Sequence, residues 1–280
     1  MDYDPIKSRL SRLFLRRPWM MRLMFLLSRQ FFLREREVRR ALGDLAAQGL
    51  LPRRILDAGT GYGQYALALR AHFPQAGILS VDINPACVAR LEVMTREGGL
   101  QGVKARQADL LDFQVDEPVD LVLNVDVVEH IQDDQRVFNG FARALAPGGL
   151  LLLHTPAMED GLSEEEVLLR TPAVGEHARE GYTRGMMRQR LRQAGLEEIF
   201  LRSTYGRAGG LAWRLGVRTP LRMLSWGLWT LPFVLIWLVV VLVPVRLLNS
   251  LDVAAGRGPT PRPAGGCMLV LARRPVDQTL

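Results

Sequence analysis

The feature that most constrains the fold is a regular alternation of short apolar runs with helix-length segments over residues 53–156. Such alternation is typical of βαβ units, whose right-handed crossovers build a parallel sheet. A predicted helix over 183–195 and predicted strands over 197–204 and 267–274 extend the pattern. The sequence therefore predicts a doubly wound α/β fold. The predicted strands of the repeating part are 53–59, 77–83, 103–109, 119–128 and 149–156.

A glycine-rich turn, Asp57-Ala58-Gly59-Thr60-Gly61-Tyr62-Gly63, follows the first predicted strand and opens a helix. Its glycines let the backbone pass close to a ligand, and Asp57 can hold a cationic amine. The GxGxG spacing differs from the GxGxxG of pyrophosphate-binding folds. Asp82 ends the second predicted strand, where a carboxylate accepts hydrogen bonds from ribose hydroxyls, and Asp109 ends the third. Any one acid alone would be interpreted as a loop cap or a solvated carboxylate, but three successive strand ends favour a binding edge.

In their order, these segments resemble the class I S-adenosylmethionine-dependent methyltransferases. The matching segments are ILDAGTGYG (55–63), LSVDI (79–83), QADLLDF (107–113), DLVLNVDVVEHI (120–131) and LAPGGLLLLHTP (145–156). The resemblance implies a Rossmann-like, seven-stranded sheet whose antiparallel last strand lies between the fifth and the sixth. It implies an enzyme with S-adenosyl-L-methionine as its cofactor. The cofactor-binding residues that it implies are Asp57, Gly59, Thr60, Gly61 and Gly63 around the methionine part, Asp82 at the ribose, Ile83, Asp109 and Leu110 at the adenine, and Asn124 facing the methyl donor.

The segment Asp126-Val127-Val128-Glu129-His130 is a second candidate for chemistry, because residues 126, 129 and 130 fall on one side of a helical turn. It resembles the Glu-x-x-Glu-His set of ubiquinone-pathway and small-RNA O-methyltransferases, with Asp126 in place of the first Glu. The resemblance implies that Asp126, Glu129, His130 and the distant His177 hold a divalent metal such as Mg²⁺. Two alternatives stay open: a metal-free site in which Glu129 and His130 are catalytic, with His130 as general base or polar pocket wall, and a purely structural role.

A further loop, which contains Arg179, Glu180 and Tyr182, is where members of this family typically cover the acceptor. These three side chains are candidates for acceptor contacts, and a solvated loop is the alternative. Cys87 and Cys267 are isolated in the sequence and lack the spacing of a zinc site, which favours reduced thiols in a reducing compartment.

The net charge of +7 is distributed unevenly along the chain. Residues 1–50 and 205–266 each carry +6, whereas residues 51–204 carry −6. Because the basic flanks are also strongly apolar, they favour an anionic membrane surface over nucleic acid as partner. The predicted domains are basic amphipathic N-terminal helices (1–50), the methyltransferase core (51–204), an apolar membrane-associating insertion (205–266), and the last strand with the tail (267–280). A cap helix that packs on the core is the alternative for residues 6–33.

The segment Trp226–Leu248 has one charge in 23 residues and is long enough to cross a bilayer as a helix. Both ends of the insertion are predicted to lie in one sheet, so a single crossing conflicts with the fold. We therefore expect the segment to enter and leave one leaflet, with Pro232 and Pro244 breaking the helix. A buried helix, an apolar oligomer interface and a true span are the alternatives.

These features together predict a membrane-associated methyltransferase that acts on a lipophilic acceptor, such as a quinone precursor, a polyprenyl-linked glycan or a lipid. O-methylation is favoured by the resemblance at Glu129 and His130. We expect a peripheral or monotopic protein on the cytoplasmic face of a membrane, and the sequence leaves its oligomeric state open. The alternatives are an RNA or soluble small-molecule methyltransferase, and a non-catalytic, membrane-bound assembly subunit with this fold.

Overall fold

The computed structural model describes residues 25–26, 29–97, 100–171, 178–255 and 266–276. The chain divides into two compact units. One unit is Ala41–Arg202 with Cys267–Leu280, and the other is Met1–Arg40 with Ser203–Gly266. Most of the predicted N-terminal amphipathic helices, the linker at 256–265 and His177 lie outside the described residues.

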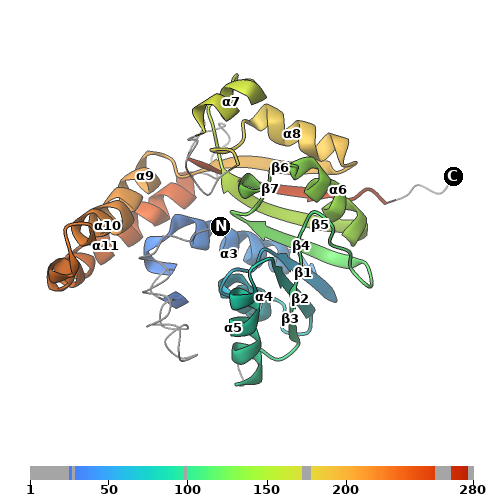
Figure 1. Cartoon of the computed structure of the whole chain (residues 1–280), viewed down its shortest axis with the longest axis horizontal. Coiled ribbons are helices and arrows are strands. Elements are labelled where there is room, and N and C mark those ends of the chain that lie inside the picture. Colours follow the sequence, from blue (N-terminus) through green and yellow to red (C-terminus); the bar gives the residue numbers. More distant parts are fainter. Residues whose placement is uncertain (1–24, 27–28, 98–99, 172–177, 256–265, 277–280) are drawn as a thin grey trace. The chain divides into compact units, whose positions relative to one another are not determined.

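A seven-stranded sheet has the strand order β3-β2-β1-β4-β5-β7-β6 (Figure 1). The pairs β1/β2, β1/β4, β2/β3 and β4/β5 are parallel, and β5/β7 is antiparallel. This order confirms the predicted last strand between the fifth and the sixth. The strands are β1 Arg54–Ala58, β2 Gly77–Asp82, β3 Val103–Gln107, β4 Val119–Val125, β5 Leu145–Pro156, β6 Glu197–Thr204 and β7 Cys267–Arg273.

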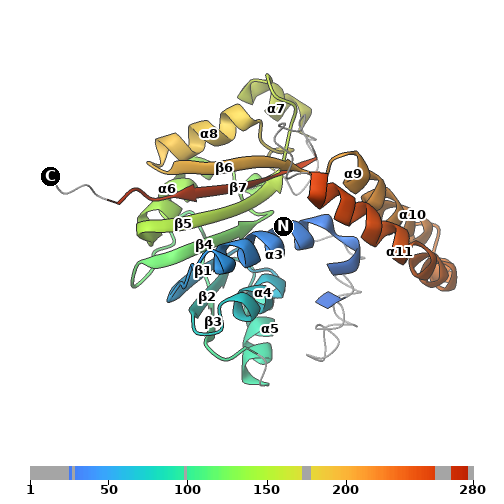
Figure 2. The ribbon, with the colours of Figure 1, turned by 180° about the vertical axis from the view of Figure 1, so that it is seen from behind.

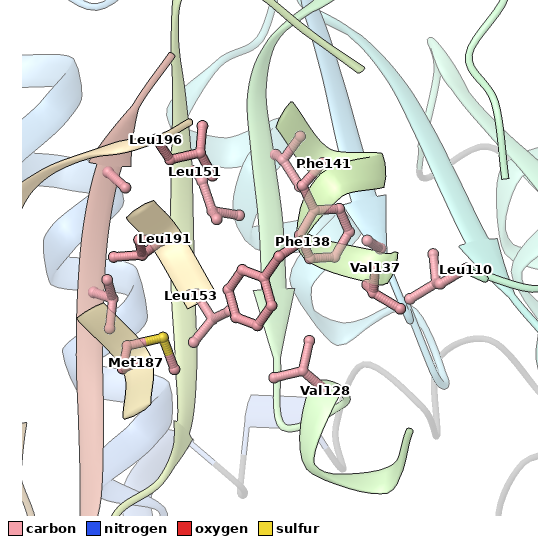
Figure 3. Packing of buried hydrophobic residues seen from close by; sticks show 14 of the residues in the cluster. Leu110, Val128, Val137, Phe138, Phe141, Leu151, Leu153, Met187, Leu191 and Leu196 are labelled. Atoms are coloured by element: carbon pink, nitrogen blue, oxygen red, sulfur yellow. The ribbon is translucent and has the colours of Figure 1, made fainter. Parts of the chain in front are cut away.

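Helices connect the strands of the core, and each crossover returns the chain to the same edge of the sheet. The helices of this part are α4 Gln64–His72, α5 Pro85–Arg96, η1 Val128–His130, α6 Asp134–Ala144, α7 Glu164–Arg170 and α8 Arg184–Gln193. The boundary between the two units falls inside α3 Leu33–Ala47, which precedes β1. Leu151, Leu152 and Leu153 of β5 are all fully buried. Figure 3 shows how Phe138 and Phe141 of α6 pack beside Leu151 and Leu153 in this core. The packing fixes the strand ends that carry the candidate site.

The second unit contains a helical hairpin (Figure 2). Its first arm is α9 Arg207–Trp213, the π-helical turn η2 Arg214–Arg218 and α10 Thr219–Leu224, and after η3 Leu228–Thr230 the second arm is α11 Leu231–Ala255. Near one end, Gly209 N–H donates to Asp252 Oδ1 at 3.0 Å. Nearer the other, Trp237 Nε1 of α11 donates to the Leu215 carbonyl of the first arm at 2.9 Å. The two arms are therefore antiparallel partners along their length.

The expectation that Pro232 and Pro244 break the apolar helix is wrong, because α11 is continuous over 25 residues. Pro232 lies in the first helical turn, where a backbone N–H has no intrahelical partner in any case. Pro244 lies inside the helix and removes one hydrogen bond without ending it. The reversal of direction occurs instead before α11, at Gly227, whose φ is 130°.

Candidate functional site

The glycine-rich turn lies at the carboxyl end of β1 and is held to β2. Gly59 and Thr60 both donate their N–H groups to the Val81 carbonyl at 2.9 Å. Gly59 has a φ of 80°, and a Cβ there would lie 2.4 Å from a methyl carbon of Val127. Gly61 has a φ of 53°, and a Cβ there would meet nothing within 4 Å. The turn therefore needs glycine at 59 for close packing, and at 61 it offers open space beside the backbone, where a ligand fits.

Asp82 ends β2, as predicted, and it organises the turn. Its Oδ2 accepts the Gly61 N–H at 2.8 Å, and its Oδ1 accepts the Asn84 N–H at 2.9 Å. A carboxylate has about four lone-pair positions, so two positions remain for ligand hydroxyls. Asp82 is half-buried. Its geometry fits a group that fixes the turn and accepts hydrogen bonds from a ribose.

Asp57 is almost completely buried and accepts a hydrogen bond from Ser80 Oγ at 3.0 Å. Burial raises the pKa of Asp57 to about 6, and the hydrogen bond from Ser80 limits the increase. A buried carboxylate with a raised pKa is stabilised by a nearby cation. Asp57 is therefore suited to a ligand that brings a positively charged amine.

Asn124 in β4 is fully buried beside the same turn. Its Nδ2 donates to the Ala58 carbonyl at 2.9 Å, whereas its Oδ1 has no hydrogen-bond partner in the described part of the chain. An unpaired buried acceptor is costly, so a ligand donor at this position would be stabilising. Asn124 thus fits the predicted position at the donor site.

The residues expected at the adenine differ from one another in exposure. Ile83 is 54% exposed directly after β2, which suits an apolar contact with a flat ring. Asp109 is exposed, and its Oδ1 caps the turn by accepting the Leu111 N–H at 2.9 Å. Leu110 packs its side chain in the hydrophobic core. Only its backbone can then meet a ligand edge.

Asp126 begins the second candidate set, and its conformation was not predicted. It has a φ of 51°, in the left-handed region, so the helical turn begins only at Val128. Its backbone N–H donates to the His154 carbonyl at 2.8 Å, and its Oδ1 lies 2.8 Å from His154 Nδ1. Asp126 is thus held at His154 of β5 and lies before the turn that carries Glu129 and His130.

Glu129 is buried, and its Oε2 accepts a hydrogen bond from Thr155 Oγ1 at 3.0 Å. His130 is half-exposed at the end of the same turn. In the described ranges, no group of three or more His, Cys, Asp or Glu side chains is placed to hold a metal ion. Asp126 and Glu129 are each bound to a side chain of β5, and metal binding by Asp126, Glu129, His130 and His177 stays a prediction. His177, the fourth proposed ligand, lies outside the described residues.

Arg179 and Tyr182 lie in a buried network, which corrects their assignment to a loop over the acceptor. Arg179 donates to the carbonyls of Ile131 and Gln132 at 2.9 Å and lies 3.1 Å from Asp134. Tyr182 donates to Asp134 Oδ2 at 2.8 Å and is fully buried. These contacts fix the turn after β4. Glu180 is exposed.

His154 and Thr155 are the site residues that the sequence interpretation missed. Both are fully buried near the carboxyl end of β5 and hold Asp126 and Glu129 in place. The rule that identified Asp57 and Asp82, polar residues at the carboxyl ends of parallel strands, applies equally to them. Because both lie inside an apolar strand, the sequence pattern alone did not single them out as site residues.

The profile of a family described as a methyltransferase domain matches residues 31–199. This chain belongs to that family. It is a class I S-adenosylmethionine-dependent methyltransferase, and the fold, the glycine-rich turn and the carboxylate at the end of β2 agree with this assignment.

Three known proteins are similar to the methyltransferase. A trans-aconitate 2-methyltransferase from Methylobacterium nodulans is 34% identical over 49% of this chain and 51% of its own length. A malonyl-[acyl-carrier protein] O-methyltransferase from Xylella fastidiosa is 33% identical over 36% of this chain and 34% of its own length. A structure assigned as a sarcosine dimethylglycine methyltransferase from Galdieria sulphuraria has a TM-score of 0.61 at 21% identity, covers 86% of both chains and shares the fold. The chain thus spans about half or less of these two curated relatives.

Proposed function

We propose that this methyltransferase transfers the methyl group of S-adenosyl-L-methionine to a lipophilic acceptor at a membrane surface. The observation that carries the proposal is the exposed apolar side of α11. The helix contains an 18-residue window with a mean hydropathy of 2.6, of which 17% is buried. A cytosolic core helix of this hydropathy would bury most of its side chains. The large exposed apolar residues of α11 are Leu231, Phe233, Leu235, Ile236, Val239, Val240, Val243, Leu247 and Leu251.

The exposed arginines of the first arm support an orientation of α11 in which its apolar side faces the membrane. Arg207, Arg214, Arg218 and Arg222 recur at helical spacing and are exposed, whereas Gly209, Ala212 and Gly216 on the opposite side are buried. Gly216 and Ala212 pack at Val245 of α11. The arginines therefore face away from α11. The hairpin has an apolar side on α11 and an arginine-bearing side that also exposes Leu211 and Leu221.

This two-sided hairpin favours a helix that lies in the plane of the interface. If it entered tip first, Arg214, Arg218 and Arg222 would enter the hydrocarbon, at about 3 kcal/mol for each arginine near the bilayer centre. If it lay flat, the apolar side of α11 would enter the acyl region while the arginines stayed near headgroups and water. Trp226 and Trp229, both exposed at the tip, are side chains that favour the interface.

The chemical step needs little covalent participation from the protein. S-adenosyl-L-methionine supplies an activated methyl group, so the residues contribute binding, alignment and proton removal. In this proposal Asp57 pairs with the amine, Asp82 holds the ribose, and the Asn124 Oδ1 meets a donor of the ligand. His130, half-exposed, takes the proton of the acceptor hydroxyl, and buried Glu129 positions the turn that carries His130. No step is assigned to a metal.

A soluble, acidic acceptor is the second candidate function, and the relatives named for trans-aconitate and malonyl-[acyl-carrier protein] favour it. On this alternative α11 would anchor the enzyme without contributing to acceptor access. O-methylation is common to both candidates. An RNA acceptor has no comparable support, because the basic side of the hairpin is paired with an apolar side.

The test incubates purified enzyme with methyl-labelled S-adenosylmethionine and membranes from the source organism, then partitions the label between organic and aqueous phases. The proposal predicts label in the organic phase, and none with Asp82→Ala. Label confined to the aqueous phase would overturn the lipophilic acceptor and favour the second candidate. Absence of any transfer, with donor binding intact, would contradict the catalytic proposal.

A further inference from the structure

The strongest unassigned feature is a basic groove of about 470 Å³ between the start of α3 and the end of α11. All of its lining residues belong to the unit that contains the hairpin. Five arginines line it: Arg29, Arg36, Arg39, Arg40 and Arg246. The acidic side chain in the lining is Glu35, whose Oε2 accepts a hydrogen bond from Arg39 Nε at 3.1 Å. One carboxylate thus faces five guanidinium groups.

Arg36 and Arg246 show that the positive charges are held close together. Arg36 donates to the Arg246 carbonyl at 3.2 Å and to Ser250 Oγ at 3.0 Å. Burial lowers the pKa of Arg36, and the positive charge of Arg246 lowers it further. Two like charges placed side by side destabilise the fold unless an anion neutralises them. The side chains that line the groove therefore do not neutralise its positive charge.

Three of the arginines are available to a ligand. The guanidinium groups of Arg29, Arg40 and Arg246 have no hydrogen-bond or ion-pair partner among the described residues. Arg36 and Arg40 are four residues apart on α3, which places them on one side of the helix. Guanidinium groups bind phosphate oxygens in a bidentate fashion, and several of them around one groove are typical of phosphate recognition.

The border of the groove indicates what the phosphate is attached to. Arg246, Ser250 and Val253 line the groove on α11, and Leu247 and Leu251 on the same helix are 60% and 61% exposed. These two leucines continue the apolar side of α11, so the charged groove passes directly into a surface for acyl or prenyl chains. A free phosphate would use the arginines alone, whereas an amphiphile would use both surfaces.

We propose that this groove binds the phosphate group of an anionic amphiphile, with the apolar chain lying along Leu247 and Leu251 of α11. The assignment extends the proposed function at the membrane surface, but the groove residues stand on their own contacts. The ligand class is a phosphate ester or diphosphate with an aliphatic tail. It is held by charge and by apolar contact together.

The experiment compares the full chain with Arg40→Gln/Arg246→Gln, which removes two unpaired groove charges, and with Arg53→Gln/Arg192→Gln, a matched loss of two exposed charges on the core unit. Binding to phosphatidylcholine vesicles with and without phosphatidic acid is measured by sedimentation. We expect the groove variant to lose about tenfold or more of its affinity for the phosphatidic acid vesicles, and the matched variant much less. Equal losses would indicate diffuse attraction and overturn the site.

A second measurement separates the site from the membrane proposal. Calorimetry with monomeric dihexanoyl phosphatidic acid, glycerol 3-phosphate and inorganic phosphate needs no bilayer. The proposal predicts that dihexanoyl phosphatidic acid binds the wild type most tightly and that the groove variant loses this binding. Equal affinity for glycerol 3-phosphate would overturn the apolar half of the site, and no binding of any of the three would overturn the groove. Failure of the wild type to bind any vesicle, with calorimetric binding intact, would contradict membrane association alone.

Discussion

The sheet core and the hairpin bury apolar side chains to opposite extents, although both contain runs of Leu and Val. In β5, Leu151, Leu152 and Leu153 are all fully buried. In α11, Val239, Val240 and Val243 are between 62% and 75% exposed. Hydrophobicity alone therefore does not decide burial within one chain. The core buries its apolar surface internally, whereas one side of α11 stays exposed to a degree that the membrane proposal would explain.

The largest expected effect tests the chemistry of the core. His130→Gln should lower kcat by about 10²- to 10⁴-fold, since a general base contributes about that much. Donor affinity should stay unchanged, because Asp57, Asp82 and Asn124 form the donor contacts. Single-turnover rates with a hydroxyl acceptor measure the loss of kcat. Calorimetry with S-adenosyl-L-homocysteine measures donor affinity. An unchanged kcat across the pH range would remove His130 from the mechanism.

A matched pair of truncations tests the comparison itself. Leu152→Ala in the core should lower the free energy of unfolding by about 2–5 kcal/mol. Val243→Ala, on the exposed side of α11, should change it by less than about 0.5 kcal/mol in the absence of lipid. Denaturant unfolding measures both values. A loss at Val243 comparable to that at Leu152 would mean that another part of the chain covers this side of α11.

Asp57 gives a pH-dependent effect that is confined to the core. Its pKa is about 6 in the folded chain, against an ordinary value of 3.8. The folded state binds this proton more tightly, so its stabilising contribution is present at low pH and is lost as the pH rises through about 6. The loss amounts to at most about 3 kcal/mol.

Asp57→Asn should remove that dependence and raise stability near neutral pH while weakening donor binding. Asp116→Asn is the control, because this side chain is 89% exposed and its ion pair with Arg106 is weak. Thermal unfolding followed across the pH range, with and without S-adenosyl-L-homocysteine, provides the measurement. Parallel pH profiles for wild type and Asp57→Asn would contradict a raised pKa of the buried Asp57 carboxylate.

The smallest effect concerns the left-handed backbone at Asp126. Asp126→Gly relieves the conformational strain, which is of order 1 kcal/mol, but removes the contact with His154. Asparagine also tolerates the left-handed region, so Asp126→Asn keeps this backbone conformation, and it keeps some of the side-chain contacts of Asp126. We therefore expect nearly unchanged stability for Asp126→Asn and a modest net loss for Asp126→Gly. A net gain with glycine would mean that the pairing with His154 contributes little.

Much of the core followed from sequence because its determinants are local or periodic. Strand 197–204 was predicted with the bounds of β6, and Asp82 was expected at the end of a strand for a stated chemical reason. The features that were missed depend on contacts between distant segments. Arg179 becomes structural only when Asp134 and the turn after β4 surround it, and Asp126 is turned toward β5 by His154. The predicted helix break at Pro244 was wrong, because one lost hydrogen bond does not end a long helix that packs along a partner arm.

The most direct test of the account places nitroxide labels at Phe233, Val240 and Leu247 of α11, and at Arg218 of the other arm. A Cys267→Ser background leaves Cys87, which is buried and whose pKa burial raises to about 12. Accessibility to oxygen and to a water-soluble nickel chelate is measured on anionic vesicles. The account predicts one shared, shallow depth for the three α11 labels and a water-exposed label at 218. Depth that increases steadily from 247 to 233 would contradict the flat orientation, and labels that stay in water at every position would contradict the membrane-facing hairpin.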